Sequence, residues 1–445
     1  MSDSGDVKHF AAPVAVRGTV RVPGDKSISH RALLLAGVAT GKSRIGGLGP
    51  GADVAATAHC LRQLGVAIRG AAPTVTVDSP GWGAWQSPRG VLECGNSGTT
   101  MRLLLGLLAA RPGLVATLDG DASLRQRPMA RVVAPLQDMG ADIGSSGGRP
   151  PLFVRGRHLA GAAHTLAVAS AQVKSALLLA GLFADGETSI AAPQPTRDHT
   201  ERLLARQGVG CSEEHGVLRI RGAGVGADLP PLGAYQVPGD PSSAAFPIVL
   251  ALLHPAARIA VASVALSPRR LGFVRVLQRM GAQLRVEAGA TRENEPTGRL
   301  LAASSALIAT AVTAAEIPDC IDELPLLCLA AAAAHGTTRF AGLAELRVKE
   351  SDRLAATARL LADLGVASDV GEDWLCVHGV GRAQAWQPGA APFAPGLDHR
   401  MAMTAAVASS VQARALGIRG FDAAVASSWP GFAAALGSLG VSELP

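Results

Sequence analysis

A helical segment followed by a glycine and a short β-like run recurs six times along the chain. In the first occurrence, apolar residues at helical spacing lead to Leu64-Gly65, and the apolar run 66–68 follows. The glycines that end the helical half are 68 to 84 residues apart along the chain: Gly65, Gly140, Gly208, Gly281, Gly365 and Gly440. A glycine in this place predicts the left-handed residue that ends many helices.

Each repeat predicts a β/α module that contains more than one strand. After three of the glycines, a second apolar run is expected to form the hairpin partner of the first, at 152–155, 217–220 and 374–377. The spacing of the repeats is too long for the usual solenoids, and a chain of 445 residues is too long for one core. We therefore expect an α/β protein with two similar domains, each built from three β/α units.

Three stretches show neither the helical nor the strand pattern of apolar residues and are predicted to be surface connections: 78–90, 287–300 and 380–395. A domain junction is expected near 237–241, where Pro238-Gly239-Asp240-Pro241 interrupts the pattern.

Composition narrows the classes of partner. The net charge is +6, which suits anionic ligands, but the basic residues are scattered rather than clustered. Aromatic residues make up 3% of the chain and tyrosine occurs once, so stacking platforms for bases are not expected. These features favour small anions over nucleic acid.

Cysteine usage and hydropathy favour a cytoplasmic protein. The six cysteines are dispersed without metal-ligand or disulfide spacing, so no metal and no cofactor is expected. Residues 1–10 are polar and lack the apolar core of a signal peptide. The longest apolar run, 324–334, is too short to cross a bilayer, so no membrane association is expected.

The stretch 23–31 carries the strongest chemical signal. Pro23-Gly24 marks a turn, and the apolar run after Arg31 continues as a helix. Lys26, Ser27 and Arg31 then lie in its first turns, where free backbone N–H groups and the helix dipole favour anions. The alternative is a capped surface helix with solvated charges, and this stretch alone leaves both interpretations open.

Similar polar clusters precede other helical patterns in both halves of the chain. Only five of the 41 basic residues are lysines, so a retained lysine is mildly informative. Each cluster alone is more typical of a solvated helix start, but together they indicate a polyanion held between two domains. The clusters are 94–102, 119–128, 170–174, 196–200, 322–323, 347–353 and 398–400.

In these stretches the chain resembles the 5-enolpyruvylshikimate-3-phosphate synthases. The matching motifs occur in order across nearly the whole chain, which makes the resemblance highly specific. They are Pro-Gly-Asp-Lys-Ser at 23–27, Gly-Asn-Ser-Gly-Thr at 95–99, Arg-Pro at 127–128, Ser-Ala-Gln at 170–172, Arg-Val-Lys-Glu-Ser-Asp-Arg at 347–353 and Asp-His-Arg at 398–400.

The resemblance implies two similar domains of three β/α units with the active site in the cleft between them. The upper domain would span 25–238, and the lower would combine 1–24 with 239–445. It implies a transferase of the shikimate pathway, which leads through chorismate to the aromatic amino acids. The enzyme would transfer the enolpyruvyl group of phosphoenolpyruvate to the 5-hydroxyl of shikimate 3-phosphate, with release of phosphate. Inhibition by glyphosate and a monomeric state are also expected.

The resemblance also implies the residues of the site. Those that bind shikimate 3-phosphate would be Lys26, Ser27, Arg31, Ser170, Gln172, Arg197, Asp322 and Lys349. Those around phosphoenolpyruvate would be Lys26, Gly98, Arg127, Gln172, Arg353 and Arg400. Arginine suits bidentate contacts to carboxylates and phosphates, and lysine suits a point contact.

Lys26, Asp322 and Glu350 are the catalytic candidates. One group must take the proton of the 5-hydroxyl, and another must protonate the methylene carbon. We assign Asp322 as the base and Glu350 as the proton shuttle, with Lys26 as general acid or electrostatic stabiliser. The reverse assignment of the two carboxylates stays open.

Two positions depart from the pattern of the family. Ala171 stands where many members have a second serine, and Ser427 stands where some members have a lysine that contacts phosphoenolpyruvate. The competing interpretations are a UDP-N-acetylglucosamine enolpyruvyl transferase and a non-catalytic anion-binding relative. Ser27 after Lys26 and the lack of cysteine in 119–128 disfavour the first, and the presence of Asp322 and Glu350 disfavours the second.

Overall fold

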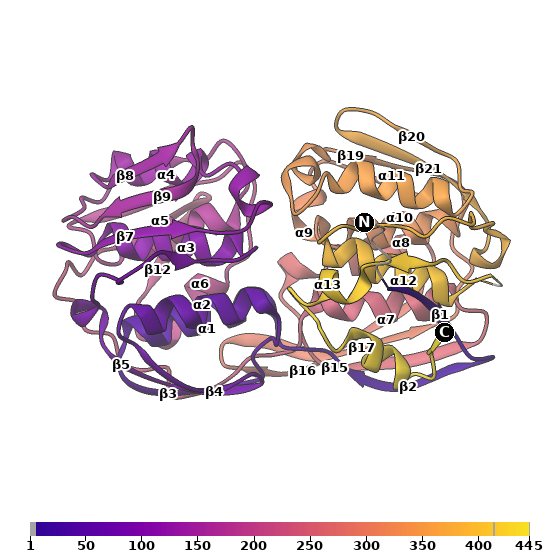
Figure 1. Cartoon of the computed structure of the whole chain (residues 1–445), viewed down its shortest axis with the longest axis horizontal. Helices are drawn as coiled ribbons and strands as arrows, with labels where there is room; N and C mark the ends of the chain where they lie inside the picture. Colours follow the sequence, from indigo (N-terminus) through magenta and orange to yellow (C-terminus); the bar gives the residue numbers. More distant parts are fainter. Residues whose placement is uncertain (1–5, 413, 445) are drawn as a thin grey trace. The chain divides into compact units, whose positions relative to one another are not determined.

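The computed structural model describes residues 6–412 and 414–444, which belong to two compact units. The continuous unit spans 26–237, and the discontinuous unit combines 1–25 with 238–445. Figure 1 follows the chain through both by colour. The expected boundaries after 24 and after 238 each lie one residue from these divisions.

The continuous unit contains three four-stranded sheets with one shared pattern of pairing. In each, a short strand pairs in parallel with a central strand, which pairs antiparallel with one arm of a hairpin. The first sheet has the order β14-β3-β5-β4, from β3 (Thr40–Gly46), β4 (Ala67–Ala71), β5 (Thr74–Pro80) and β14 (Ala234–Gln236). The second has the order β6-β7-β9-β8, from β6 (Leu92–Glu93), β7 (Val115–Asp119), β8 (Asp142–Ser146) and β9 (Arg149–Arg155). The third has the order β10-β11-β13-β12, from β10 (Ala163–Thr165), β11 (Glu187–Ala191), β12 (Cys211–Glu214) and β13 (Val217–Arg221).

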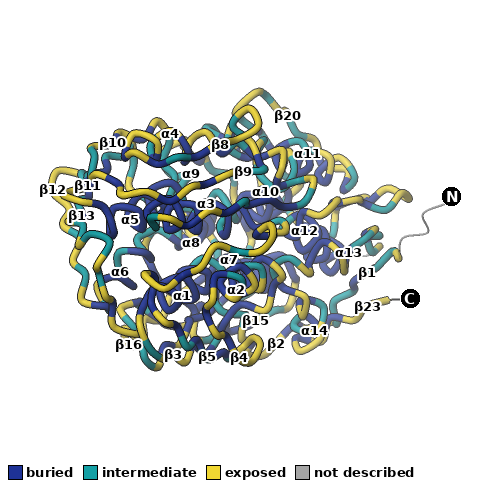
Figure 2. The backbone as a smooth tube through the Cα atoms, turned by 60° about the vertical axis from the view of Figure 1, so that its left-hand side comes forward, coloured by how far each residue is buried: buried dark blue, intermediate teal, exposed yellow. Residues whose placement is uncertain are grey.

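The helices of the continuous unit are of two kinds. Three are apolar beyond their first turns and nearly fully buried, as Figure 2 shows in dark blue: α1 (Lys26–Val38), α3 (Gly98–Ala109) and α5 (Ala171–Gly181). The other three bury one face only: α2 (Ala52–Gln63), α4 (Ala130–Asp138) and α6 (His199–Arg206). A helix without a polar face must lie inside, whereas an amphipathic helix can cover the surface. Two single 3₁₀ turns complete the unit, η1 (Trp82–Ala84) and η2 (Leu124–Gln126).

Two sheets of the discontinuous unit repeat the same pairing pattern. One has the order β16-β17-β15-β2, from β2 (Val16–Arg21), β15 (Ala257–Ala265), β16 (Gln283–Arg292) and β17 (Glu295–Ala303). The other has the order β18-β19-β21-β20, from β18 (Ala311–Val312), β19 (His335–Ala341), β20 (Ser368–Val370) and β21 (Trp374–Val380).

The last sheet of this unit is closed by the two ends of the chain. It has the order β22-β1-β23, from β1 (Val7–Ala11), β22 (Ile418–Arg419) and β23 (Ser442–Leu444), with both pairings antiparallel. A parallel bridge between Phe393 and Ile418 extends it. The pattern of the other sheets is thus kept, but β1 supplies the hairpin strand that the sixth repeat lacks at its own end.

The helices of the discontinuous unit follow the same division. The buried set is α7 (Pro241–Leu253), α10 (Leu324–Ala332) and α12 (His399–Ser410). The helices that bury only part of their surface, or are short, are α8 (Gly272–Arg279), α9 (Ile317–Cys320), α11 (Arg353–Asp363), α13 (Phe421–Val425) and α14 (Phe432–Gly437). The 3₁₀ segments are η3 (Pro268–Arg270), η4 (Ala344–Val348) and η5 (Ala383–Ala385).

The repeat pattern read from the sequence is confirmed. All six repeat glycines have φ between +71° and +98°, the left-handed region in which a glycine ends a helix without strain. The expected hairpin partners 152–155, 217–220 and 374–377 lie in β9, β13 and β21, each paired antiparallel with the strand before it.

The prediction that 287–300 is a surface connection is wrong. This stretch forms most of the hairpin of β16 and β17, which turns at Glu293 and Asn294 with φ of +53° and +62°. Most of β16 after Leu284 is exposed, so nothing selects apolar residues there and the alternation that marks a half-buried strand is missing.

No helix among the described residues is long and apolar enough to cross a membrane.

Candidate active site

Five of the polar stretches singled out in the sequence, 23–31, 94–102, 170–174, 322–323 and 398–400, lie at the N-terminal ends of buried helices. The stretches 196–200 and 347–353 precede the partly buried α6 and α11, 119–128 contains η2, and the buried α7 follows the predicted junction. In the continuous unit the starts of the buried helices carry Lys26 on α1, Gly98 on α3 and Ser170 before α5. In the discontinuous unit Asp240 precedes α7, Glu323 precedes α10 and Asp398 precedes α12. Unpaired backbone N–H groups at these ends favour anions.

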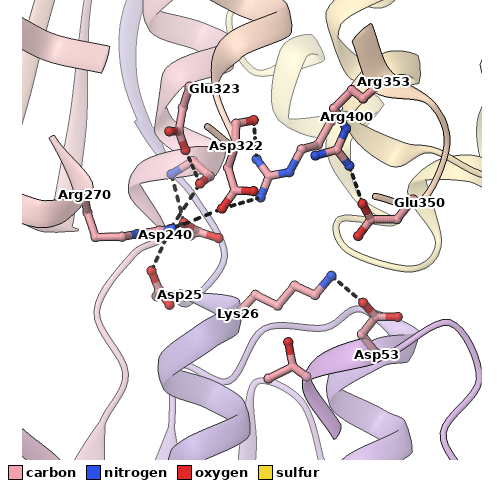
Figure 3. Close-up of polar contacts among 12 residues, drawn as sticks. Asp25, Lys26, Asp53, Asp240, Arg270, Asp322, Glu323, Glu350, Arg353 and Arg400 are labelled. Atoms are coloured by element: carbon pink, nitrogen blue, oxygen red, sulfur yellow. Dashed lines mark hydrogen bonds and ion pairs between the residues drawn. The ribbon is translucent and has the colours of Figure 1, made fainter. Parts of the chain in front are cut away.

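Lys26 begins α1 and forms an ion pair with Asp53 in the first turn of α2 (Figure 3). The Asp53 side chain is 6% exposed and that of Lys26 is 20% exposed. The Asp53 carboxylate holds the Lys26 ammonium group in place, and part of the lysine side chain stays accessible. Asp53 lies outside the motifs singled out in the sequence.

Arg31 lies one turn further along α1, and its guanidinium is buried. Its Nε donates to Thr200 Oγ1 at 2.8 Å, and its Nη2 donates to Ser175 Oγ at 2.7 Å. Its Nη1 donates to the backbone oxygen of Ser27 at 2.9 Å. These hydroxyl and carbonyl partners hold the guanidinium of Arg31 in one orientation.

A second network joins α3 to α5. Gln172 accepts a hydrogen bond on Oε1 from Arg102 Nη1 at 2.6 Å and donates from Nε2 to Thr99 Oγ1 at 2.9 Å. A Cβ atom on Gly98 would lie 2.7 Å from Arg102 Nη1 and 3.4 Å from Arg127 Nη1. Two guanidinium groups therefore lie beside the N-terminal end of α3, and the lack of a side chain on Gly98 lets them approach the backbone there. Arg102 ends the polar stretch 94–102 but is not among the predicted site residues.

The two arginines of the polar loop 119–128 have different roles in the structure. Arg125 is exposed and pairs with Asp119, and its guanidinium lowers the pKa of that carboxyl. Arg127 is buried and donates to Asn96 Oδ1, in the loop that leads into α3. The structure thus places Arg127 beside the start of α3 and Arg125 in a surface ion pair.

Ser170, Lys174 and Arg197 surround the start of α5. Ser170 caps this helix, because its Oγ accepts from the Val173 N–H at 3.3 Å. Lys174 is buried, pairs with Glu201 and donates to the Arg197 backbone oxygen at 2.8 Å. Lys174 therefore holds the loop that carries Arg197, whose side chain is half-buried.

In the discontinuous unit, Asp322 lies between two arginines. Arg400 Nη1 donates to the backbone oxygen of Asp322 at 3.0 Å, and its Nη2 lies 3.7 Å from the carboxylate Oδ2. Arg270 Nη1 lies 3.7 Å from the same oxygen (Figure 3). The predicted base is thus held by cations from α12 and η3.

Arg353 joins Glu350 to Asp398. Its Nη2 donates to Glu350 Oε2 at 2.5 Å, and its Nε donates to Asp398 Oδ2 at 3.0 Å. Burial alone would lower the pKa of Arg353, but the two carboxylates outweigh it and raise the pKa. Glu350, the other acid–base candidate, is therefore anchored on a permanently charged group.

The remaining predicted residues lie close to these clusters in the chain. Ser27 follows Lys26 on α1, Ala171 is the first residue of α5, and the half-buried Lys349 follows η4. Ser427 Oγ lies 3.1 Å from His399 Nδ1, beside the start of α12. A hydroxyl thus stands beside His399 where the family resemblance placed a lysine.

The residues missed by the sequence analysis share one signal. Asp53 stands in the first turn of α2, and Arg102 stands in the second turn of α3. Each is a charged residue on the side of a helix that the apolar pattern marks as buried, and a buried charge requires a partner. Among the described residues, no group of three or more His, Cys, Asp or Glu side chains could hold a metal ion.

Comparisons with known proteins agree with this arrangement. The family model described as EPSP synthase (3-phosphoshikimate 1-carboxyvinyltransferase) matches residues 10–436. The 3-phosphoshikimate 1-carboxyvinyltransferase of Rhodospirillum rubrum is 46% identical over 444 residues, covering 97% of this chain and 96% of the relative. That of Thermus thermophilus is 48% identical over 395 residues, covering 88% and 90%. A solved EPSP synthase from Acinetobacter baumannii is 37% identical, covers 99% of both chains and superposes with a TM-score of 0.84. The chain belongs to the EPSP synthase (3-phosphoshikimate 1-carboxyvinyltransferase) family.

Proposed function

We propose that this chain is a transferase that converts shikimate 3-phosphate and phosphoenolpyruvate into 5-enolpyruvylshikimate 3-phosphate and phosphate. A bond forms between the 5-oxygen of shikimate 3-phosphate and C2 of phosphoenolpyruvate, and the bond from C2 to the phosphate oxygen breaks. The hydroxyl proton leaves, and the methylene carbon gains and then loses a proton. This reaction belongs to the shikimate pathway, which supplies chorismate for the aromatic amino acids.

The observation that carries the proposal is the pair of carboxylates held by arginines in the discontinuous unit. The Asp322 carboxylate lies 3.7 Å from the guanidinium groups of Arg270 and Arg400, and Glu350 forms an ion pair with Arg353. Acid–base catalysis at two atoms of the substrates requires two such groups with separate surroundings. We assign Asp322 to the 5-hydroxyl and Glu350 to the methylene carbon, with Lys26 as the cation that stabilises developing negative charge.

The basic residues supply the charge balance that the two substrates require. Each substrate carries a phosphate and a carboxylate, and two like charges about 4 Å apart repel by roughly 4 kcal/mol at an effective dielectric constant of about 20. We propose that shikimate 3-phosphate contacts Lys26, Ser27, Arg31, Ser170, Gln172, Arg197, Asp322 and Lys349. We propose that phosphoenolpyruvate contacts Lys26, Gly98, Arg127, Gln172, Arg353 and Arg400.

Phosphate release with phosphoenolpyruvate and each of two acceptors tests the proposal. Shikimate 3-phosphate should support release, and UDP-N-acetylglucosamine and a mixture without acceptor should not. The variant Lys26→Met should lose the release, and the exposed Lys42→Met should keep it. Release with the nucleotide sugar alone would instead make the chain a UDP-N-acetylglucosamine enolpyruvyl transferase. No release with either acceptor would favour a non-catalytic anion-binding protein.

We also infer that the enzyme acts in the cytoplasm as a monomer. All six cysteines are free in the structure, as is usual for proteins of a reducing compartment. Light scattering coupled to size-exclusion chromatography checks the oligomeric state, since the monomer mass is 45.1 kDa.

A further inference from the structure

Arg270 is a buried cation inside a group of acidic side chains in the discontinuous unit. Its Nη2 lies 3.0 Å from Asp25 Oδ2 and 2.5 Å from Asp240 Oδ1, and it donates to Ser242 Oγ at 3.1 Å. The side chains of Arg270 and Asp25 are 3% and 0% exposed. Burial alone would lower the pKa of Arg270, but Asp25 and Asp240 outweigh it and raise the pKa, so the group stays charged.

Asp25 and Asp240 stand where the chain passes from one unit to the other. The divisions fall after Asp25 and before Pro238. The Asp25 N–H donates to the Pro238 oxygen at 2.8 Å, and the Asp240 N–H donates to the Pro23 oxygen at 2.9 Å. The two connecting segments are thus paired through their backbones, and Arg270 joins their side chains.

The other nitrogen of the same guanidinium faces the predicted base. Arg270 Nη1 lies 3.7 Å from Asp322 Oδ2, while Nη2 donates hydrogen bonds to Asp25, Asp240 and Ser242 (Figure 3). The charged groups that face or adjoin Asp322 within this unit are Arg270 from η3, Arg353 from α11, Arg400 from α12 and the neighbouring Glu323.

We propose that Arg270 is a positioning residue that holds the Asp322 carboxylate and both chain connections in one fixed arrangement. The inference rests on the proposed role of Asp322 as a base. Lys26 directly follows Asp25, so the same guanidinium also fixes the backbone from which the Lys26 side chain departs. Arg270 contacts the catalytic candidate and the connections and touches no reacting atom in this scheme.

The planar fork of arginine is the feature on which this role depends. A lysine at 270 keeps one positive charge. Its single nitrogen can pair with Asp25 and Asp240 or with Asp322, but not with all three. Asp25 and Asp240 lie closer and are more deeply buried, so the lysine should stay with them. Arg270→Lys should therefore keep the fold and remove the cation from Asp322.

The test measures kcat, KM and the pH profile of kcat for Arg270→Lys. We expect kcat to fall about tenfold or more while both KM values change less than about threefold. The acid limb of the kcat profile should move to higher pH, because a carboxylate that loses a neighbouring cation holds its proton more tightly. The matched control is Arg269→Lys, since Arg269 adjoins Arg270 in η3 but its side chain is 43% exposed and lies 3.7 Å from Asp319.

A kcat and a pH profile equal to those of the Arg269→Lys control would overturn the inference. A fall in kcat without a shifted acid limb would overturn it as well, because loss of packing alone predicts that result. If Arg270→Lys does not fold, the same profile is measured on Arg270→Gln combined with Asp240→Asn, which removes one charge of each sign. The same two outcomes then decide. A parent protein without phosphate release contradicts the proposed function, whereas an active parent with an unaffected variant contradicts only the role of Arg270.

Discussion

Arg353 Nε lies 3.0 Å from Asp398 Oδ2, and the side chains of the two residues are 1% and 0% exposed. Asp398 also accepts from Ser351 Oγ at 2.8 Å and from the Arg400 N–H at 3.0 Å, where it caps α12. One carboxylate thus neutralises a buried cation and orients the first turn of the helix that carries Arg400. The pair links the stability of the discontinuous unit to the placement of two predicted substrate contacts.

Asp398→Asn should destabilise the protein by about 3–5 kcal/mol, because it leaves a buried guanidinium with less compensating charge. Asparagine caps helices about as well as aspartate, so the loss reports mainly the charge. Denaturant unfolding of parent and variant measures it.

The matched control for this prediction is Asp352→Asn, at the cap of α11. Asp352 is exposed and pairs with Arg347 at 2.8 Å, so its loss should cost less than about 1 kcal/mol. Equal losses for the two variants would contradict the assignment of a buried, charge-dependent role to Asp398.

Glu350→Gln should lower kcat by roughly 10²-fold or more, the usual scale for loss of a general acid–base group. Glutamine keeps the size of the side chain and can still accept from Arg353 Nη2, so the KM values should change little. Steady-state phosphate release measures both constants.

Glu372→Gln provides the control, because Glu372 is exposed near β21 and belongs to no predicted contact. Turnover of Glu350→Gln close to that of this control would remove Glu350 from the mechanism.

The repeat architecture was predictable because each module carries its own local signal. A glycine with positive φ ends each helix and an apolar residue follows it, so neighbouring residues alone reveal the module. The closure of the sixth sheet had no local signal, because β1 and β23 pair across almost the whole length of the chain.

The candidate site was predictable to the extent that it lies at helix starts. Lys26, Gln172 and Arg400 stand in motifs that read as anion sites from a few adjacent residues. Arg270 and Asp53 do not, because each is a single charge whose partners come from distant parts of the chain or another helix. Only the fold shows that such a charge is buried and paired.

His164 should make the stability of the protein fall in mildly acidic solution. It lies on β10, is 7% exposed, and its Nε2 has no hydrogen-bond partner among the described residues. Burial lowers the pKa of His164 from 6.5, and Asp138 offsets only part of this effect. Below pH 6.5 the unfolded chain therefore binds a proton that the folded protein does not, so stability is full above that pH and falls as the pH decreases.

The size of this loss approaches about 1.4 kcal/mol per pH unit while His164 stays neutral in the folded state. Denaturant unfolding between pH 7.5 and 5.5 should show a smaller decrease for His164→Leu than for the parent. The exposed His158→Gln serves as control and should follow the parent. Parallel curves for all three proteins would exclude His164 as the source of the pH dependence.

Gly98→Ala should weaken inhibition by glyphosate more than it weakens the use of phosphoenolpyruvate. The added methyl group would lie 2.7 Å from Arg102 Nη1, so this guanidinium must move, and Gln172 is bonded to it. Displacement in a filled site typically costs about 1–3 kcal/mol. Glyphosate is longer than phosphoenolpyruvate and tolerates less displacement, so its Ki should rise further than the substrate KM.

Gly437→Ala is the control, because a Cβ there meets no atom within 4 Å. Competitive inhibition against phosphoenolpyruvate measures the effect in all three proteins, and equal Ki values for parent and Gly98→Ala would exclude Gly98 from the inhibitor site.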